Sequence, residues 1–335
     1  MTRVLVTGGA GYVGSVSAAA FIEAGHEVVV LDDLTTGHRA AVPAGATFHQ
    51  GTYVDGEAVA RLLEAERIEA ILHCAARSLV GESIREPARY FGQNVAGGVA
   101  LLDAARAVGV ERIVFSSTAA VYGIPDATPI PEGAPLRPIN PYGESKRAFE
   151  SALAWYGRAY GLRSVTLRYF NVAGATEALG EVHEPETHLI PNVLRAADGV
   201  ADATIFGDDY PTPDGTCIRD YIHVSDLAEA HLLALTATAT ATALDDPRTA
   251  EPLVCNLGNG GGFSVREVLA AAERATGRAI PYAVGGRRAG DPPVLVARST
   301  RAAEILGWRP ARPSLDEMVR SAWAWRQAHP GGYED

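Results

Sequence analysis

Short runs of β-branched and apolar residues alternate with longer helix-period segments through the first half of the chain. Runs of this kind predict buried strands, and their alternation with amphipathic helices is typical of a parallel sheet covered on both faces. We therefore predict an α/β fold with a doubly wound parallel sheet. Its expected strands are residues 4–6, 28–31, 70–74, 112–116 and 165–168.

The pattern changes after Asn171, where glycine- and proline-rich loops such as GDDYPTPDGT (207–216) separate shorter elements. A chain of 335 residues is also long for a single core. We expect a first domain over residues 1–175, with return segments near 220–257, and a smaller α+β lobe over 176–335. The repeat TATATATAL (236–244) follows a helical pattern and is interpreted as a helix end and an exposed connection.

The composition, with 47% hydrophobic and 21% charged residues, is typical of a soluble globular protein. A net charge of −11 disfavours a nucleic-acid partner, because phosphate binding needs clustered cations. Cys74, Cys217 and Cys255 lack metal-ligand spacing, so we interpret them as structural thiols in a reducing compartment and predict no metal site. No signal-peptide pattern precedes the first strand, and no apolar run is long enough to span a bilayer; we expect a cytoplasmic protein without a membrane partner.

The segment VLVTGGAGYVG joins a predicted strand to a predicted helix and carries Gly8, Gly11 and Gly14 at the spacing GxxGxxG. Glycines let a backbone approach a pyrophosphate, and a helix N-terminus offers N–H groups and a positive dipole. Asp32, at the end of the second strand, can accept from ribose hydroxyls and would repel a 2′-phosphate. These features predict a Rossmann-type site that favours NAD, although Arg39 nearby favours NADP. A plain tight turn is the alternative.

The segment NPYGESK places Tyr142 four residues before Lys146 on a predicted helix, so that both side chains face one side. A phenol is a poor base at neutral pH, but a neighbouring ammonium stabilises the phenolate and lowers the pKa of the phenol. Thr118 is expected just past the strand 112–116, where its hydroxyl can relay or orient a proton. Together they predict a general base for a substrate hydroxyl. Taken singly, each feature has a simpler interpretation: a chance YxxxK spacing for Tyr142 and Lys146, and a local hydrogen-bond cap for Thr118.

A series of motifs in order along the chain resembles the extended short-chain dehydrogenase/reductases, and among them the UDP-galactose (UDP-glucose) 4-epimerases. The motifs are TGGAGYVG, HCAARSLVGES, VFSSTAAVYG, NPYGESK, RYFNVAGA, ETHLIP, FGDDYPTPDGTCIRDYIHVSDLA, NLGNGGGFSV and RRAGDPP. The block DGTCIRDYIHVSDL discriminates best, since many sister enzymes share the glycine and YxxxK motifs. The resemblance implies that Tyr142 removes a proton from a sugar hydroxyl while hydride passes to NAD, giving a 4-keto sugar that rotates and is reduced again. Lys146 would hold the nicotinamide ribose, and Thr118 takes the place of the usual serine.

The same resemblance implies the residues around each ligand. For the NAD cofactor they are Gly8, Gly11, Tyr12, Val13, Gly14, Asp32, Asp33, Leu34, Thr35, Thr36, Gly37, Thr52, Tyr53, Cys74, Ala75, Ala76, Ser78, Asn94, Thr118, Tyr142, Lys146 and Phe170. For the UDP-sugar substrate they are Thr118, Tyr142, Asn171, His188, Leu189, Ile190, Thr204, Ile205, Phe206, Arg219, Tyr221, Arg288, Asp291 and Leu295. The two arginines would hold the diphosphate and Asp291 the nucleotide ribose. At the position of Leu295 the epimerases carry tyrosine when restricted to UDP-hexoses, and a small residue when an N-acetyl group is admitted.

Two positions depart from the pattern of these epimerases. Ser78 replaces a frequent lysine and follows Arg77, so that either side chain could reach the NAD phosphates. Thr52 replaces a common aspartate near adenine. Neither change removes a group that the chemistry requires.

Three other functions compete with this reading. A 4,6-dehydratase would need an acid pair where this chain has Ala119 and Ala120. A non-catalytic NAD-sensing regulator would lose the catalytic groups. A 4-epimerase of UDP-pentoses, UDP-uronates or UDP-N-acetylhexosamines remains open.

Two further segments, 90–108 and 145–160, each predict a long helix with apolar residues at helical spacing. In the family that the chain resembles, these helices commonly pair across a two-fold axis into a four-helix bundle. The resemblance therefore implies a homodimer. The alternative is that both helices only cover the sheet.

Overall fold

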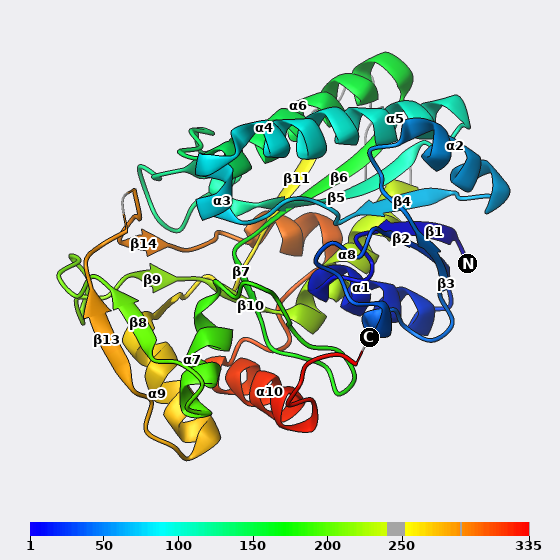
Figure 1. The fold of residues 1–335 in the computed structure, drawn as a ribbon. Coiled ribbons are helices and arrows are strands. Elements are labelled where there is room, and N and C mark those ends of the chain that lie inside the picture. The colour runs from blue at the N-terminus through cyan, green and yellow to red at the C-terminus, as the bar shows by residue number, and fades with distance from the viewer. Residues whose placement is uncertain (240–251, 289, 335) are drawn as a thin grey trace.

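The centre of the molecule is a seven-stranded sheet in which every neighbouring pair is parallel (Figure 1). The computed structural model describes residues 1–239, 252–288 and 290–334. The strand order is β11-β6-β5-β4-β1-β2-β3. The chain adds β2 and β3 on one side of β1 and then β4, β5 and β6 on the other, so the strand order reverses between β1 and β4. The strands are β1 (Arg3–Thr7), β2 (Glu27–Asp32), β3 (Thr47–Gln50), β4 (Ala70–His73), β5 (Arg112–Thr118), β6 (Arg163–Tyr169) and β11 (Leu253–Leu257).

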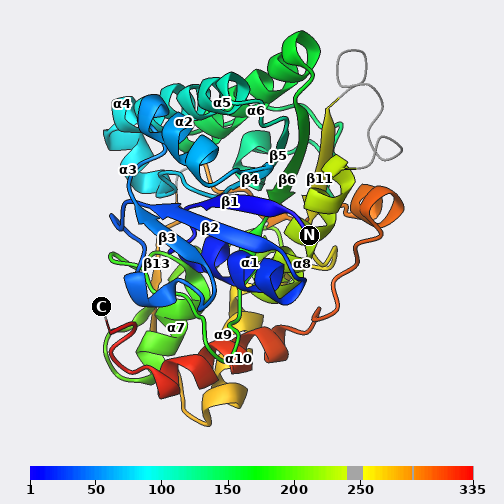
Figure 2. The ribbon, with the colours of Figure 1, turned by 90° about the vertical axis from the view of Figure 1, so that its right-hand side faces the viewer.

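Helices cover both faces of this sheet (Figures 1 and 2). One face carries α2 (Gly56–Ala65), α5 (Gly98–Ala107) and α6 (Pro141–Tyr160), and the other carries α1 (Tyr12–Glu23) and α8 (Val224–Ala239). Successive side chains of a strand point to opposite faces. Accordingly Leu5 packs in the first layer, whereas its neighbours Val4 and Val6 pack in the second. The predicted doubly wound Rossmann-type fold is confirmed.

A second core lies beyond β6, around the buried side chains Val193, Val268 and Met318. Its elements are α7 (Leu189–Ala197), β8 (Ala203–Phe206), β9 (Ile218–Arg219), β12 (Phe263–Ser264), α9 (Val265–Thr276), β13 (Tyr282–Gly285), β14 (Val294–Leu295) and α10 (Leu315–Ala328). Two short strands, β7 (Asn171–Ala173) and β10 (Tyr221–His223), pair in parallel between the cores. The chain then returns to the main sheet through α8 and β11.

The remaining helical turns are short and mostly border the site. They are η1 (Arg39–Ala41), α3 (Val80–Arg85), α4 (Pro87–Tyr90), the π-helical η2 (Phe91–Gly97), η3 (Ala119–Tyr122) and the π-helical η4 (Ala302–Leu306). The helix predicted over 90–108 is thus α4, η2 and α5 in series. The segment 145–160 lies within α6, which begins after the Asn140 cap and ends at Gly161 with φ 81°.

Two sequence-based expectations about helix ends and membranes can be compared with the structure. Residues 236–239 of the TATATATAL repeat end α8, as expected, while 240–244 lie outside the described residues. Among the described residues, no helix is long and apolar enough to cross a membrane.

Candidate active site

A cavity of about 1220 Å³ opens at the carboxyl ends of the central strands and extends to the second core. In open α/β sheets this edge, near the reversal of strand order, is where ligands bind. The cavity is lined by every predicted site residue except Leu34, Asn94 and Ile205. The cofactor set and the substrate set, far apart in sequence, therefore face one space.

The glycine turn forms the tight cradle that its sequence predicts. Gly8 has φ +72°, and a Cβ there would lie 2.7 Å from the backbone nitrogen of Ala75. A Cβ at Gly14 would lie 2.0 Å from the carbonyl oxygen of Gly8, so neither position accepts a side chain. This packing brings the N-terminus of α1, from Tyr12 onward, to the cavity wall. Its free N–H groups and positive dipole end fit a pyrophosphate.

Asp32 ends β2 with its carboxylate held in one orientation. Its Oδ2 accepts from the backbone N–H of Ala10 at 3.0 Å and its Oδ1 from that of Leu34 at 2.9 Å. Burial raises the pKa of the carboxyl, and the two N–H donors oppose that rise. A carboxylate has further lone pairs, so it can still accept from ribose hydroxyls.

Tyr142 and Thr118 lie together on the wall of the cavity, at the start of α6 and the last residue of β5. Thr118 is therefore part of the strand, not just past its end as expected. Burial raises the pKa of the Tyr142 phenol above its usual value, and a hydrogen bond with Thr118 partly opposes this. The predicted lowering of this pKa by Lys146 is wrong for this structure.

The reason is the direction of the Lys146 ammonium. Its Nζ donates to the carbonyl oxygen of Ser116 at 2.8 Å and lies 4.7 Å from the centre of the Phe115 ring. Burial lowers the pKa of Lys146 to about 8, although Cys74 and Glu150 raise it. The cation is thus anchored to β5.

The predicted substrate side contains two arginines, the kind of cation that an acidic protein needs to hold an anion. The Arg219 guanidinium contacts Asp291 with Nη2 2.5 Å from Oδ1, while its Nη1 donates to the carbonyl oxygen of Ile218 at 2.8 Å. The Arg288 guanidinium stacks on the Phe206 ring, with its Cζ 3.9 Å from the ring centre. Guanidinium groups held in this way keep further N–H donors for phosphate oxygens.

Three predicted residues lie behind the wall of the cavity. The buried Asn94 amide accepts from the backbone N–H of Arg77 at 2.8 Å and donates to its carbonyl oxygen at 3.0 Å. It also donates to the Ser145 hydroxyl at 3.0 Å, so that it joins the loop after β4 to α6. Leu34 has a positive φ of 59° and orients Asp32 through its N–H. Ile205 is part of the second core.

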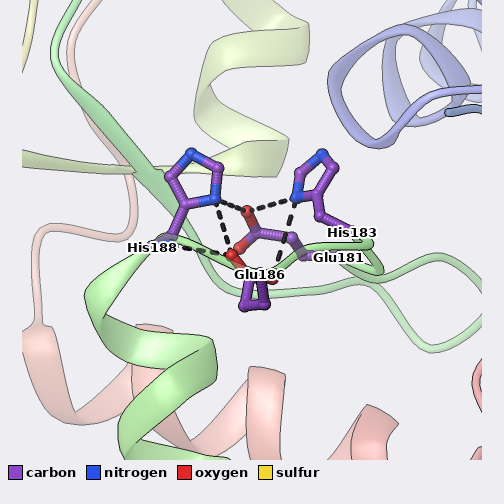
Figure 3. Close-up of side chains that lie close together, drawn as sticks. All are labelled: Glu181, His183, Glu186 and His188. Carbon is purple, nitrogen blue, oxygen red and sulfur yellow. Dashed lines mark hydrogen bonds and ion pairs between the residues drawn. The ribbon is translucent and has the colours of Figure 1, made fainter. Parts of the chain in front are cut away.

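Sequence reasoning missed a cluster of four ionisable side chains on the segment before α7 (Figure 3). Glu181, His183, Glu186 and His188 bring their ligand atoms within 4.8 Å of one another, and all four line the cavity. Only His188 was predicted as a site residue. The available signal was the pattern ExHxxExH, which is polar and compact in sequence.

Comparison with known proteins identifies the family. The model of the NAD dependent epimerase/dehydratase family matches residues 4–245. The chain belongs to this family. It is 52% identical over 335 residues to a UDP-glucose 4-epimerase of Streptomyces lividans, with 99% of this chain and 98% of that relative covered.

Solved structures of the family are similar over almost the whole chain. The crystal structure of UDP-glucose 4-epimerase from Brucella ovis in complex with NAD has a TM-score of 0.91 and 46% identity, covering 96% of this chain and 98% of that one. The enzyme from Bifidobacterium longum in complex with NAD⁺ and UDP has a TM-score of 0.91 and 35% identity, covering 99% and 100%. The predicted family resemblance, fold and NAD cofactor are confirmed.

Proposed function

We propose that this member of the family is a UDP-glucose 4-epimerase, interconverting UDP-glucose and UDP-galactose. The carrying observation is that Tyr142 and Thr118 share one cavity with the glycine turn and with Arg219 and Arg288. A proton-transfer pair, a dinucleotide cradle and a diphosphate clamp are the three parts that such a reaction needs. The high identity to epimerases over the full chain supports the same assignment.

In this proposal Tyr142 receives the proton of the sugar 4-hydroxyl, and Thr118 orients that proton through its hydroxyl. The chemistry that NAD supplies when bound is reversible hydride transfer at the sugar C4. Lys146, fixed by the Ser116 carbonyl, would hold the nicotinamide ribose of the cofactor. Returning the proton from Tyr142 completes the reaction, so the residues end in their starting state.

The nucleotide end of the substrate would be held by Arg219 and Arg288, with Asp291 accepting from the ribose. Bidentate arginine suits phosphate oxygens, and holding the diphosphate leaves the sugar free to turn between its two faces. Leu295, on β14 beside Arg219 on β9, borders the sugar end of the cavity and packs near Phe170.

A 4,6-dehydratase on the same fold is the alternative in the same family, and the cavity wall argues against it. Elimination of water needs an acid pair next to the catalytic threonine. Ala119 and Ala120 line the cavity at those positions and offer no proton donor.

The assignment is tested by incubating the purified protein with single UDP-sugars and resolving the products. UDP-glucose and UDP-galactose should interconvert in both directions to the same ratio. UDP-pentoses, UDP-uronates and UDP-N-acetylglucosamine are run in parallel. Turnover of one of these at a higher rate than UDP-galactose would replace the proposed substrate, and absence of any turnover would overturn the proposed activity.

We also propose that the chain forms a homodimer through α4–η2–α5 and α6. Large apolar side chains remain exposed on these helices, including Phe91 at 41% and Trp155 at 62% exposure. Burying such side chains against a second copy would be favourable.

A further inference from the structure

We propose that Glu181, His183, Glu186 and His188 form a binding site for one Zn²⁺ ion. The four residues lie on the segment between β7 and α7 and line the cavity. Figure 3 shows their side chains meeting. They offer two imidazole nitrogens and two carboxylate groups, a set of donors that suits zinc.

The spacing of the donor atoms matches a tetrahedral ion. Zn–N and Zn–O bonds of about 2.0–2.2 Å place neighbouring ligand atoms roughly 3.3–3.6 Å apart in a tetrahedron. His183 Nδ1 lies 3.1 Å from Glu181 Oε1 and 3.7 Å from Glu186 Oε2. His188 Nδ1 lies 2.9 Å from Oε1 of each glutamate. Three of these four distances are shorter than the tetrahedral edge and one is slightly longer, and Glu186 presents a different oxygen to each histidine, so the side chains would have to spread slightly around one ion.

The rival explanation, two imidazolium–carboxylate pairs, fits the ring nitrogens less well. His183 Nδ1 is buried and makes no hydrogen bond among the described residues, although Glu181 Oε1 is 3.1 Å away. His188 Nδ1 shares a hydrogen bond of 2.9 Å with Glu186 Oε1, but it carries at most one proton and lies equally close to Glu181 Oε1. We therefore interpret the Nδ1 atoms of His183 and His188 as ligands whose lone pairs point to one shared cation.

Burial strengthens the need for a cation here. The side chains of Glu181 and Glu186 are only 9% and 4% exposed, and two carboxylates buried side by side require compensating charge, which either a metal ion or the imidazolium forms of His183 and His188 can supply. The half-exposed His188 leaves a path for an ion. Because α7 starts directly after this residue, a bound ion would fix the segment that carries Leu189 and Ile190 to the cavity.

The test measures metal on the full-length protein without substrate. Protein stripped with a chelator is titrated with ZnCl₂ against a competing chromophoric chelator, and its metal content is determined by mass spectrometry. We expect about one Zn²⁺ per chain and a higher Tm after loading. His183→Gln should weaken zinc affinity at least about a hundredfold. His49→Gln, which removes a ring paired with Glu66 at 2.9 Å outside the cluster, should leave affinity unchanged.

Substitution with Co²⁺ keeps the proposal testable if His183→Gln does not fold. The unmodified protein should show the intense visible d–d absorption of a four-coordinate ion, without the thiolate charge-transfer band that cysteine ligands would give. Failure to retain zinc at micromolar concentration, a weak six-coordinate Co²⁺ spectrum, a thiolate band, or unchanged zinc affinity in a folded His183→Gln would each overturn the site.

Discussion

At Tyr142, two effects on the pKa of the phenol oppose each other, and burial outweighs the hydrogen bond with Thr118. The Lys146 ammonium donates instead to the carbonyl oxygen of Ser116 in the sheet. Motif spacing predicted which groups meet, but their ionisation depends on burial that spacing does not define.

The first prediction concerns the base itself. Tyr142→Phe should lower turnover at least about a hundredfold, the usual scale for losing a general base. The ring keeps its packing, including the contact with Tyr90 at 6.5 Å between centroids, so fold and NAD content should not change. A coupled assay with NAD quantification measures both. As a control, Tyr156→Phe removes a phenol that bonds Asp103 outside the cavity and should keep near-normal turnover. Near-normal turnover in Tyr142→Phe would remove it from the mechanism.

A second prediction uses the fact that Lys146 is the only lysine in the chain. Protein grown with lysine ¹³C-labelled at Cε should give one lysine signal, and its NMR titration should have a midpoint near the pKa of about 8. The unfolded value is about 10.4, so the unfolded chain binds more protons between these values and the free energy of unfolding should rise with pH there. Lys146→Met should lack this component of the rise. A midpoint above 10 would contradict the burial argument.

Leu295 allows a prediction about substrate breadth. Leucine is smaller than tyrosine and has no hydroxyl, so it leaves space for part of an acetamido group without a hydrogen bond for it. UDP-N-acetylglucosamine should therefore be a poor but detectable substrate. Leu295→Tyr should abolish that activity and spare UDP-galactose, because added bulk in a packed pocket acts by exclusion. The measurement is kcat/KM for both sugars. Equal rates in the unmodified enzyme would show that another residue limits the size of the sugar.

Among the elements, the five strands predicted from apolar runs are the ones nearest the site. They were predictable because each is buried on both faces and forms a continuous apolar stretch in the sequence. β3 was missed, since its sequence TFHQ is largely polar and only partly buried. β11 lies within the return segment expected near 220–257, but it was not predicted as a strand, because it reaches the sheet by pairing with β6 from far along the chain.

The candidate site also has parts that the sequence could predict and parts that it could not. The glycine turn and the Tyr142–Lys146 pair are local in sequence, so a strand–turn–helix pattern and helical spacing were enough to predict them. The Arg219–Asp291 contact joins residues from distant segments, and the role of Asn94 behind the cavity depends on its contacts with two other elements. The glutamate–histidine cluster is short in sequence, but its convergence depends on the path of a loop.

The turn between β1 and α1 gives a prediction about an element as a whole. Gly14→Ala would place a Cβ 2.0 Å from the Gly8 carbonyl oxygen, so helix and strand must separate. We expect loss of retained NAD and a lower Tm. The free energy of unfolding should fall by about 1–3 kcal/mol. Gly133→Ala, where a Cβ meets nothing within 4 Å, is the matched control. Full NAD content and unchanged Tm in Gly14→Ala would contradict the cradle geometry.

For the whole molecule, the last prediction is the assembly state. Figure 1 shows α4, α5 and α6 side by side in one outer layer, and Trp155 on α6 is 62% exposed there. If a second copy covers this layer, light scattering at micromolar concentration should give the mass of two chains. Trp155→Glu should shift the protein toward monomer, because it would bury a carboxylate in the interface. Tyr282→Glu adds the same charge at a 46% exposed aromatic on β13, in the second core, and should remain dimeric. A monomeric mass for the unmodified chain would mean that these helices only cover the sheet.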